Sequence, residues 1–273
     1  MTFTLPGPFW LVGCGNMAGA MLEGWLARGL DPARVTVIRP SGRSVAPDVR
    51  VLTAYPEDEA PALVMLGMKP HMLDDVAPAL APILEAETIL ISILAGVEQA
   101  SLRARFAAPR TIVKAMPNTP VKLNKGVVGL FSDSADEAAE ALVERLMAAL
   151  GHAEWLDDEA VYGVVTSLAG SGPAYLFRFI DALAAAGEKL GVPAEQARRL
   201  AVATVEGAGA LAAASDESPA QLAERVASPG GSTRAGLNLL DEGEALNILV
   251  RRTLEASLRR SLEMAQAARV REP

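Results

Sequence analysis

A glycine-rich turn near the start of the chain has the spacing of a phosphate-binding loop. Gly13-Cys14-Gly15-Asn16-Met17-Ala18 follows a short apolar run and precedes a helical pattern. In the pattern G-x-G-x-x-G/A, the first glycine permits a tight turn, the second lets backbone N–H groups approach a pyrophosphate, and the small third residue lets the helix pack on the strand. We therefore expect Gly13, Gly15, Asn16 and Met17 to bind a dinucleotide, although the motif alone also fits an ordinary strand–turn–helix.

The segment after the second apolar run indicates which dinucleotide binds. An NAD site usually places Asp or Glu there to bind the ribose 2′-hydroxyl. Here Arg39 and Ser41 occupy the segment, and residues 32–56 contain four arginines and one acidic residue. A guanidinium with hydroxyl donors fits a 2′-phosphate. We expect Arg39 and Ser41 to bind NADPH, with NADH possible; the alternative is that these are ordinary solvated surface residues.

Three further segments carry glycine, amide and hydroxyl groups: Ala115–Pro120, Gly170–Tyr175 and Ser228–Thr233. In the first, two prolines hold Asn118 at the carboxyl end of a strand, where α/β sheets bind ligands. The other two open helices, and the third offers backbone N–H groups and three hydroxyls to a carboxylate. Taken singly, each could be a helix cap or a turn.

The chain is poor in the side chains that most enzymes use for chemistry. It contains one cysteine, Cys14, and two histidines, His71 and His152. A single cysteine cannot form an internal disulfide. Two histidines and one cysteine are also too few for most zinc sites or for a nucleophile that is activated by a histidine base. We expect no metal site, so that chemistry comes mostly from a cofactor and from backbone and hydroxyl groups.

The elements that must position these groups fall into two halves. The first half alternates apolar runs with helical patterns, which indicates βαβ units and a parallel sheet covered on both faces. Strands are expected at 9–12, 35–38, 63–66, 88–93, 111–115 and 127–131, and helices at 16–27 and 136–150. The second half has no β-rich run after the acidic turn Asp157–Glu159, and its apolar residues recur at helical spacing, with one helix expected at 195–214.

The predicted fold class is therefore α/β. Residues 1–157 form an N-terminal Rossmann-type dinucleotide-binding domain, and residues 158–273 form an all-helical substrate and dimerisation domain. Alanine-rich helices with broad apolar faces often need a partner to bury them, so we expect a homodimer or higher homo-oligomer. A bundle that is complete within one chain is the alternative.

Length and composition agree with this organisation. The chain has 273 residues, enough for two domains, and a formal net charge of −8, which argues against nucleic acid and polybasic membrane partners. Apolar residues make up 51% and aromatic residues 4%, so the core is expected to consist of Ala, Leu and Val. The first basic residue is Arg28, and the most apolar stretch, 88–97, is too short to span a bilayer. We expect a soluble cytoplasmic protein with a small-molecule substrate.

Together, the motifs resemble the pyrroline-5-carboxylate reductase family nearly from end to end. The resemblance rests on the Gly13–Met17 loop, Lys69-Pro70, Ser92–Val97 and the three polar loops, which are specific to that family. It implies a Rossmann domain followed by a helical dimerisation domain, in assemblies up to decamers. It also implies reduction of a cyclic imine with NAD(P)H, the last step of proline biosynthesis.

The resemblance further implies roles for single residues. The hydroxyls of Thr233 and Ser171 would be catalytic, Thr233 by hydrogen bonding to the ring nitrogen of the substrate. The residues that would bind the substrate carboxylate are Ser228, Gly230, Gly231, Ser232 and Thr233. Asn118 would position the nicotinamide and its ribose, and Met68, Lys69 and Pro70 would line the cofactor cleft.

Three positions depart from the family pattern. Ala169 stands where a serine is usual, Gly163 where an aspartate is common, and Ala223 where a lysine is usual. The first two lie near the predicted substrate loop, so they leave the substrate affinity open. None of them removes the hydroxyls of Ser171 or Thr233.

Two other functions fit part of the pattern. A 3-hydroxyacid-type NADP dehydrogenase also combines a glycine loop with a helical domain, but enzymes of that type use a lysine from the first long helix of that domain. The only lysine of the second half, Lys189, lies at the far end of that helix. A non-catalytic NADP-binding sensor is the second alternative, which the hydroxyls of Ser171 and Thr233 make less attractive.

Overall fold

The computed structural model describes residues 4–269, which divide into two compact units. One unit runs up to Ser171 and resumes at Ser257, and the other is Gly172–Ala256. The second division falls inside the last helix, α10 (Ala245–Arg269). The acidic turn predicts a single boundary between residues 157 and 158, and that division into domains stays a prediction.

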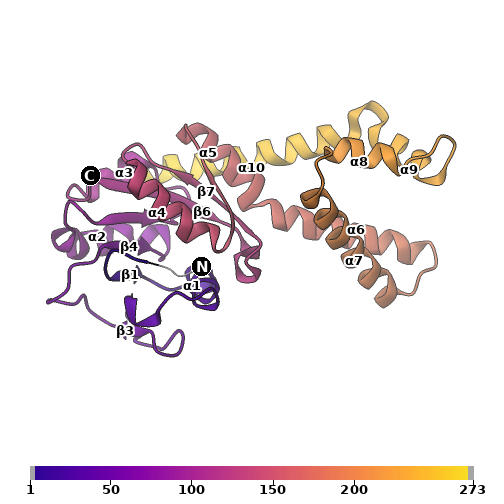
Figure 1. Cartoon of the computed structure of the whole chain (residues 1–273). Helices are drawn as coiled ribbons and strands as arrows, with labels where there is room; N and C mark the ends of the chain where they lie inside the picture. Colours follow the sequence, from indigo (N-terminus) through magenta and orange to yellow (C-terminus); the bar gives the residue numbers. More distant parts are fainter. Residues whose placement is uncertain (1–3, 270–273) are drawn as a thin grey trace. The chain divides into compact units, whose positions relative to one another are not determined.

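The first unit is built on one eight-stranded sheet with the order β3-β2-β1-β4-β5-β6-β7-β8 (Figure 1). The strands are β1 (Phe9–Val12), β2 (Val35–Ile38), β3 (Arg50–Leu52), β4 (Leu63–Leu66), β5 (Ile89–Ser92), β6 (Thr111–Pro117), β7 (Gly126–Phe131) and β8 (Gly151–Trp155). The first six have the strand order of a Rossmann fold. This confirms the predicted fold class for the N-terminal part of the chain.

The sheet is parallel except where β7 runs antiparallel to β6. The segment 118–125 between these two strands is too short for a crossover, which needs a dozen or more residues, so the chain must turn back on itself. The sequence pattern predicted β7 but not its direction. The continuous apolar runs predicted a sheet that is parallel throughout, and this prediction is wrong for the pair of β6 and β7.

Helices cover both faces of the sheet because successive strand residues point to opposite sides. Phe9 and Leu11 pack on one face with α1 (Asn16–Ala27) and α4 (Glu137–Ala148). Trp10 and Val12 pack on the other face with α2 (Leu73–Leu80) and α3 (Gln99–Arg105). The strands β1, β2 and β4 are buried along their whole length, which is why they are apolar without alternation.

Short elements connect and extend this core. The 3-10 turns are η1 (Pro32–Arg34), η2 (Pro70–Met72), η3 (Ala81–Ile83) and η4 (Thr119–Leu123). After β8, α5 (Glu159–Val165) continues directly into a π-helical turn, η5 (Thr166–Gly170). Such turns are frequent at functional sites.

The second unit is entirely helical. Its elements are α6 (Gly172–Lys189), α7 (Ala194–Ala214), α8 (Pro219–Arg225), α9 (Ser232–Asp241), the turn η6 (Glu242–Glu244) and the first part of α10. The helices α6 and α7 pack against each other (Figure 1), and a Cβ added at Gly187 would lie 3.6 Å from the Cβ of Ala197. Gly191, with φ of +103°, follows the end of the first of these helices in the left-handed conformation that glycine favours.

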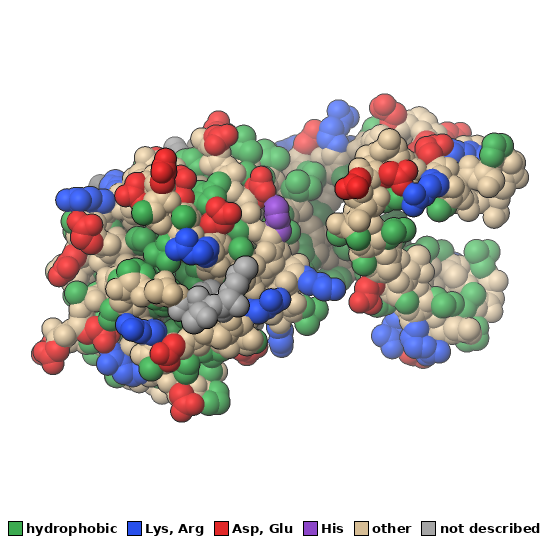
Figure 2. Space-filling view, in the orientation of Figure 1, with side chains coloured by type: hydrophobic (Ala, Val, Ile, Leu, Met, Phe, Trp, Pro, Cys, Tyr) green, Lys and Arg blue, Asp and Glu red, His purple; other side chains and the backbone are tan. Residues whose placement is uncertain are grey.

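The helices of the second unit expose an unusual number of large apolar side chains (Figure 2). The buried apolar residues among its described positions are Ala197, Ala201 and Ala227. Leu190 is 87% exposed, Leu239 69% and Phe177 61%. Helices with so little buried area of their own need a second surface to cover them. Within residues 4–269, no helix is long and apolar enough to cross a membrane.

Candidate active site

The glycine loop has the geometry of a phosphate site. Gly13 has a φ of +80°, its N–H donates to the oxygen of Ile38 at 2.8 Å, and a Cβ there would lie 2.8 Å from the nitrogen of Met68. Only glycine fits this position. Gly15 is the N-cap of α1 and no side chain caps that helix, so the first-turn N–H groups are free to bind an anion.

The third position of the motif is small for a reason that the structure shows. Ala18 is buried against Gly67, the residue after β4, and a Cβ added at Gly67 would lie 2.7 Å from the Cβ of Ala18. A larger residue at either position would push α1 off the sheet. The close packing that the motif predicts between helix and strands is therefore confirmed.

A cavity of about 620 Å³ opens beside this loop, within the first unit. Of the ten residues that the sequence assigned to the cofactor, four line it: Gly15, Asn16, Met17 and Arg39. The volume is in the range of sites for cofactors and other small molecules. The cavity, the uncapped helix N-terminus and a cation on one wall together fit a dinucleotide phosphate.

The other predicted cofactor residues are not among the lining residues of this cavity. Gly13 and Met68 are in contact beneath the loop, and Ser41 accepts a hydrogen bond on Oγ from the N–H of Arg43 at 3.4 Å. Lys69 is exposed and is the N-cap of η2, which Pro70 begins. Their contacts with a cofactor stay predictions.

Arg39 extends β2 toward the cavity. Its N–H donates to the oxygen of Leu52 at 2.9 Å, and its guanidinium has no ion-pair partner among the described residues. Burial raises the pKa of the neighbouring Cys14 thiol, while the positive charge of Arg39 acts in the opposite direction. A raised pKa keeps the thiol neutral, so Cys14 behaves as a packing group of the cavity wall.

Asn118 is 5% exposed, and both ends of its side-chain amide are used. Its Nδ2 donates to the oxygen of Ala169 at 3.0 Å, and its Oδ1 accepts from the N–H of Val127 at 2.9 Å. The oxygen of Ala169 cannot accept the usual helical bond, because the residue four positions on is Pro173, which has no N–H. Asn118 therefore joins the end of β6, the start of β7 and the π-helical turn.

Ser171 directly follows the π-helical turn. Its N–H donates to the oxygen of Thr166 at 3.1 Å, and its Oγ lies 3.5 Å from the Oγ of Ser257 in α10. The chain thus brings Ser171 and Asn118 to the same turn, through Ala169. The sequence predicted both residues, but it did not predict that Asn118 would hold the turn that carries Ser171.

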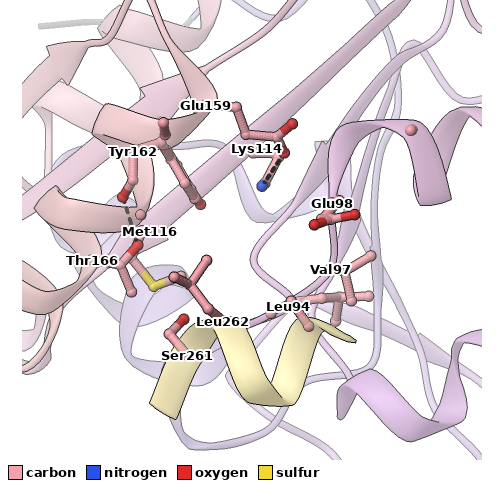
Figure 3. Close-up of a pocket in the computed structure, with 15 residues that line it drawn as sticks. Leu94, Val97, Glu98, Lys114, Met116, Glu159, Tyr162, Thr166, Ser261 and Leu262 are labelled. Atoms are coloured by element: carbon pink, nitrogen blue, oxygen red, sulfur yellow. Dashed lines mark hydrogen bonds and ion pairs between the residues drawn. The ribbon is translucent and has the colours of Figure 1, made fainter. Parts of the chain in front are cut away.

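A second pocket, of about 340 Å³, lies in the first unit beside a partly buried ion pair (Figure 3). Lys114 of β6 is 6% exposed; its Nζ lies 2.5 Å from the Oε1 of Glu159 and 4.5 Å from the ring centroid of Tyr162. The N–H of Gln99 also donates to the Oε1 of Glu159, at 2.9 Å. Burial and the charge of Glu159 raise the pKa of Tyr162. The pair fixes β6, and with it the Asn118 turn, to α5 and α3.

The predicted substrate loop lies in the second unit, between α8 and α9. Gly230 has a φ of +71°, and the N–H of Gly231 donates to the oxygen of Ser228 at 2.9 Å. Ser232 and Thr233 begin α9, which has no side-chain cap, and both are exposed. Arg234 is paired with Glu224 of α8, a hydrogen bond that raises the pKa of Arg234 and anchors the loop. The uncapped first turn of α9 and the exposed hydroxyls of Ser232 and Thr233 are available for hydrogen bonding, and the binding of a substrate there stays a prediction.

Comparison with known proteins agrees with these two parts. Residues 9–96 match the family model "NADP oxidoreductase coenzyme F420-dependent", and residues 159–264 match "Pyrroline-5-carboxylate reductase dimerisation". A pyrroline-5-carboxylate reductase of Pseudomonas aeruginosa is 38% identical over 262 residues, which cover 93% of this chain and 96% of that protein. The chain belongs to the pyrroline-5-carboxylate reductase family.

Solved structures agree with the assignment. A pyrroline-5-carboxylate reductase of Coxiella burnetii aligns with a TM-score of 0.87 at 32% identity, over 95% of this chain and 99% of the other. One of Plasmodium falciparum, described with NADP bound, aligns with a TM-score of 0.82 at 25% identity, over 95% and 98%. This reductase is thus an NAD(P)H-dependent oxidoreductase with a Rossmann-type and a helical part.

Family membership also settles part of the assembly. The match of residues 159–264 to a dimerisation model, with the exposed apolar helices described above, makes the reductase a homo-oligomer.

No group of three or more His, Cys, Asp and Glu residues is arranged to hold a metal among the described residues. Gly163, one of the departures from the family pattern, lines the pocket beside Lys114, where an added Cβ would lie 3.5 Å from the Cδ1 of Leu258.

Proposed function

We propose that the reductase binds NAD(P)H in the glycine-loop cavity and reduces 1-pyrroline-5-carboxylate to L-proline. One observation carries the proposal: the uncapped N-terminus of α1 and the unpaired cation of Arg39 line one cavity, in a chain of this family. The chain is a pyrroline-5-carboxylate reductase rather than a 3-hydroxyacid dehydrogenase or a sensor, because its relatives match along 93% of its length.

The residues of the first unit bind and orient the cofactor. The N–H groups of Gly15, Asn16 and Met17 donate hydrogen bonds to the pyrophosphate, and Arg39 with Ser41 binds a 2′-phosphate, which makes NADPH the preferred cofactor and NADH the weaker one. When bound, the cofactor supplies the hydride that adds to the imine carbon. The NADP in the Plasmodium falciparum relative supports this preference. Asn118 holds the turn that follows β6, and Met68, Lys69 and Pro70 lie after β4 on the same edge of the sheet.

The residues of the second unit bind the substrate. The N–H groups and hydroxyls of Ser228–Thr233 donate hydrogen bonds to the carboxylate, and Thr233 also donates a hydrogen bond to the ring nitrogen. Hydride addition to the imine carbon leaves the electron pair of the C=N π bond on the ring nitrogen, which takes up one proton. The Thr233 hydroxyl passes that proton on from solvent water, so no acidic side chain is needed. Ser171 supplies a second hydroxyl. Such positioning contributes roughly 7–11 kcal/mol in favourable cases.

The assembly and location follow from the same features. The exposed apolar faces of α6 and α7 are covered by a second copy of the chain, and dimers assemble further, up to decamers. Nucleic acid and membranes are not partners, because the net charge is −8. The cytoplasm is the proposed location, since a chain with one cysteine gains no disulfide from an oxidising compartment.

A coupled assay tests the proposal. NADPH absorbance is followed with 1-pyrroline-5-carboxylate as substrate, with NADH in a parallel reaction, and proline is quantified at the end. We expect one proline for each NADPH consumed and a higher kcat/KM with NADPH than with NADH. Cofactor binding without turnover would favour the sensor, and oxidation of a 3-hydroxyacid would favour the rival dehydrogenase.

A further inference from the structure

The glycine-loop cavity has a second cation that the sequence did not single out. Besides Arg39, the lining includes Lys122 and Thr119 of η4, and Glu23 is the one acidic residue among the described lining. Lys122 is exposed and has no ion-pair partner among the described residues. A cavity that holds two unpaired cations beside a free helix N-terminus is electrostatically prepared for an anion with more than one phosphate.

The two cations come from different elements. Arg39 and Ser44 belong to the segment between β2 and β3, which the ribose of a dinucleotide approaches in a Rossmann fold. Lys122 belongs to η4, beyond the end of β6. The lining also includes the first turn of α1, whose N–H groups have no side-chain cap and so can donate to a pyrophosphate.

The turn that carries Lys122 is held firmly against α1. A Cβ added at Gly24 would lie 3.3 Å from the oxygen of Val121, so the two backbones touch. On the other side of the turn, the Nδ2 of Asn124 donates to the oxygen of Ala149 at 2.8 Å, and Val121 is fully buried. Lys122 therefore projects from a fixed backbone, and less of its binding energy is lost in ordering the turn.

We infer that Lys122 binds the pyrophosphate of the dinucleotide, with the Thr119 hydroxyl beside it. This inference rests on the proposed function, because it assumes that the cavity binds the cofactor. Lys122 then takes the phosphates that NADPH and NADH share, while Arg39 takes the phosphate that only NADPH carries. Lys122 therefore contributes to the affinity for both dinucleotides, and Arg39 sets the preference for NADPH.

Binding measurements test the separate roles of Lys122 and Arg39. NADP⁺ and NAD⁺ are titrated by calorimetry into the wild-type oligomer and into the variants Lys122→Met, Lys122→Arg and Arg39→Leu. The matched control is Lys125→Met, because Lys125 is an exposed lysine three positions on that is absent from the described cavity lining. Thermal unfolding of each variant confirms that the fold is retained.

We expect Lys122→Met to lower the affinity for NADP⁺ and for NAD⁺ by the same factor, roughly tenfold. This is the size of one charge-assisted hydrogen bond in partly solvated surroundings. That factor shrinks at high salt because exposed charges are screened. Lys122→Arg keeps most of the affinity, and Lys125→Met changes the affinity for neither ligand. Arg39→Leu lowers the affinity for NADP⁺ alone.

Three results overturn the inference. Loss of NADP⁺ binding alone in Lys122→Met would place Lys122 at the 2′-phosphate, and unchanged binding of both ligands would remove it from the site. An equal loss in Lys125→Met would show a general charge effect. By contrast, wild-type protein that binds neither ligand would contradict the proposed function itself, so the two failures are distinguishable.

Discussion

Replacing Asn118 by alanine should destabilise the reductase through two backbone groups that lose their partners. The amide of Asn118 serves the N–H of Val127 and the oxygen of Ala169, at 2.9 and 3.0 Å. The second group has no α-helical donor, because the residue four positions after Ala169 is Pro173, which has no N–H. The loss therefore exceeds that of an ordinary surface hydrogen bond.

The magnitude follows from counting unsatisfied groups. Each buried backbone group without a partner costs about 1–3 kcal/mol. Both hydrogen bonds of Asn118 are only partly buried, so water can replace part of each. The expected loss of unfolding free energy for the two groups together is therefore in the lower half of the possible range, at about 2–4 kcal/mol. That is a large share of the roughly 5–15 kcal/mol that stabilises a folded protein.

Urea unfolding at one fixed protein concentration measures this loss, because subunit association also contributes to stability. The matched control is Thr119→Ala at the next position, which is exposed and should change the free energy of unfolding by less than about 0.5 kcal/mol. Asn118→Asp should recover little: it keeps the acceptor for Val127 but loses the donor to Ala169.

Cofactor binding is the second measurement for the Asn118 variants. Thr119 and Lys122 follow Asn118 directly and line the cavity, so a loosened turn should weaken NADP⁺ binding even though Asn118 itself is buried. A loss of stability below about 1 kcal/mol in Asn118→Ala would refute the reasoning, since it would mean that the two hydrogen bonds do not hold the turn.

Three other outcomes are expected. Thr233→Ala should lower kcat/KM for 1-pyrroline-5-carboxylate with little change in NADPH binding, because it removes a hydroxyl from the substrate loop only; unchanged steady-state kinetics would exclude that role. Arg39→Asp should shift the ratio of kcat/KM toward NADH, because the 2′-phosphate would meet a carboxylate; an unchanged ratio would remove Arg39 from the cofactor site. Burial raises the pKa of Cys14, so its alkylation rate should still be rising with pH above the range where a free thiol levels off, and more so in Arg39→Leu, which loses the charge that lowers this pKa. A rate that levels off at the ordinary thiol value would contradict the burial of Cys14.

The strands that the sequence predicted well are those buried on both faces. The runs 9–12, 35–38 and 63–66 match β1, β2 and β4 at both ends, and the helix at 16–27 matches α1. In each case the local pattern is sufficient: a short continuous apolar run between turn residues, or a glycine motif before a helix. The run 111–115 was too short by two residues, because the strand continues through Met116 and Pro117.

The two strands that the sequence missed are at or near the edges of the sheet. β3 has three residues and begins with the exposed Arg50, and β8 alternates partly buried residues with exposed His152 and Glu154. Neither run is apolar enough to be recognised, because one face or one edge meets solvent. Their pairing depends on neighbours that the chain supplies elsewhere, so local patterns carry little of it.

The same distinction applies to the site. The glycine loop could be predicted because its function is local: a turn, a close approach and a helix N-terminus lie within six consecutive residues. The contacts of Lys114 with Glu159 and of Asn118 with Ala169 join residues 45 and 51 positions apart. One sequence signal was present, since a lysine inside an apolar strand must find a partner or stay uncharged. Identifying Glu159 as that partner required the fold, because only the fold brings α5 against β6.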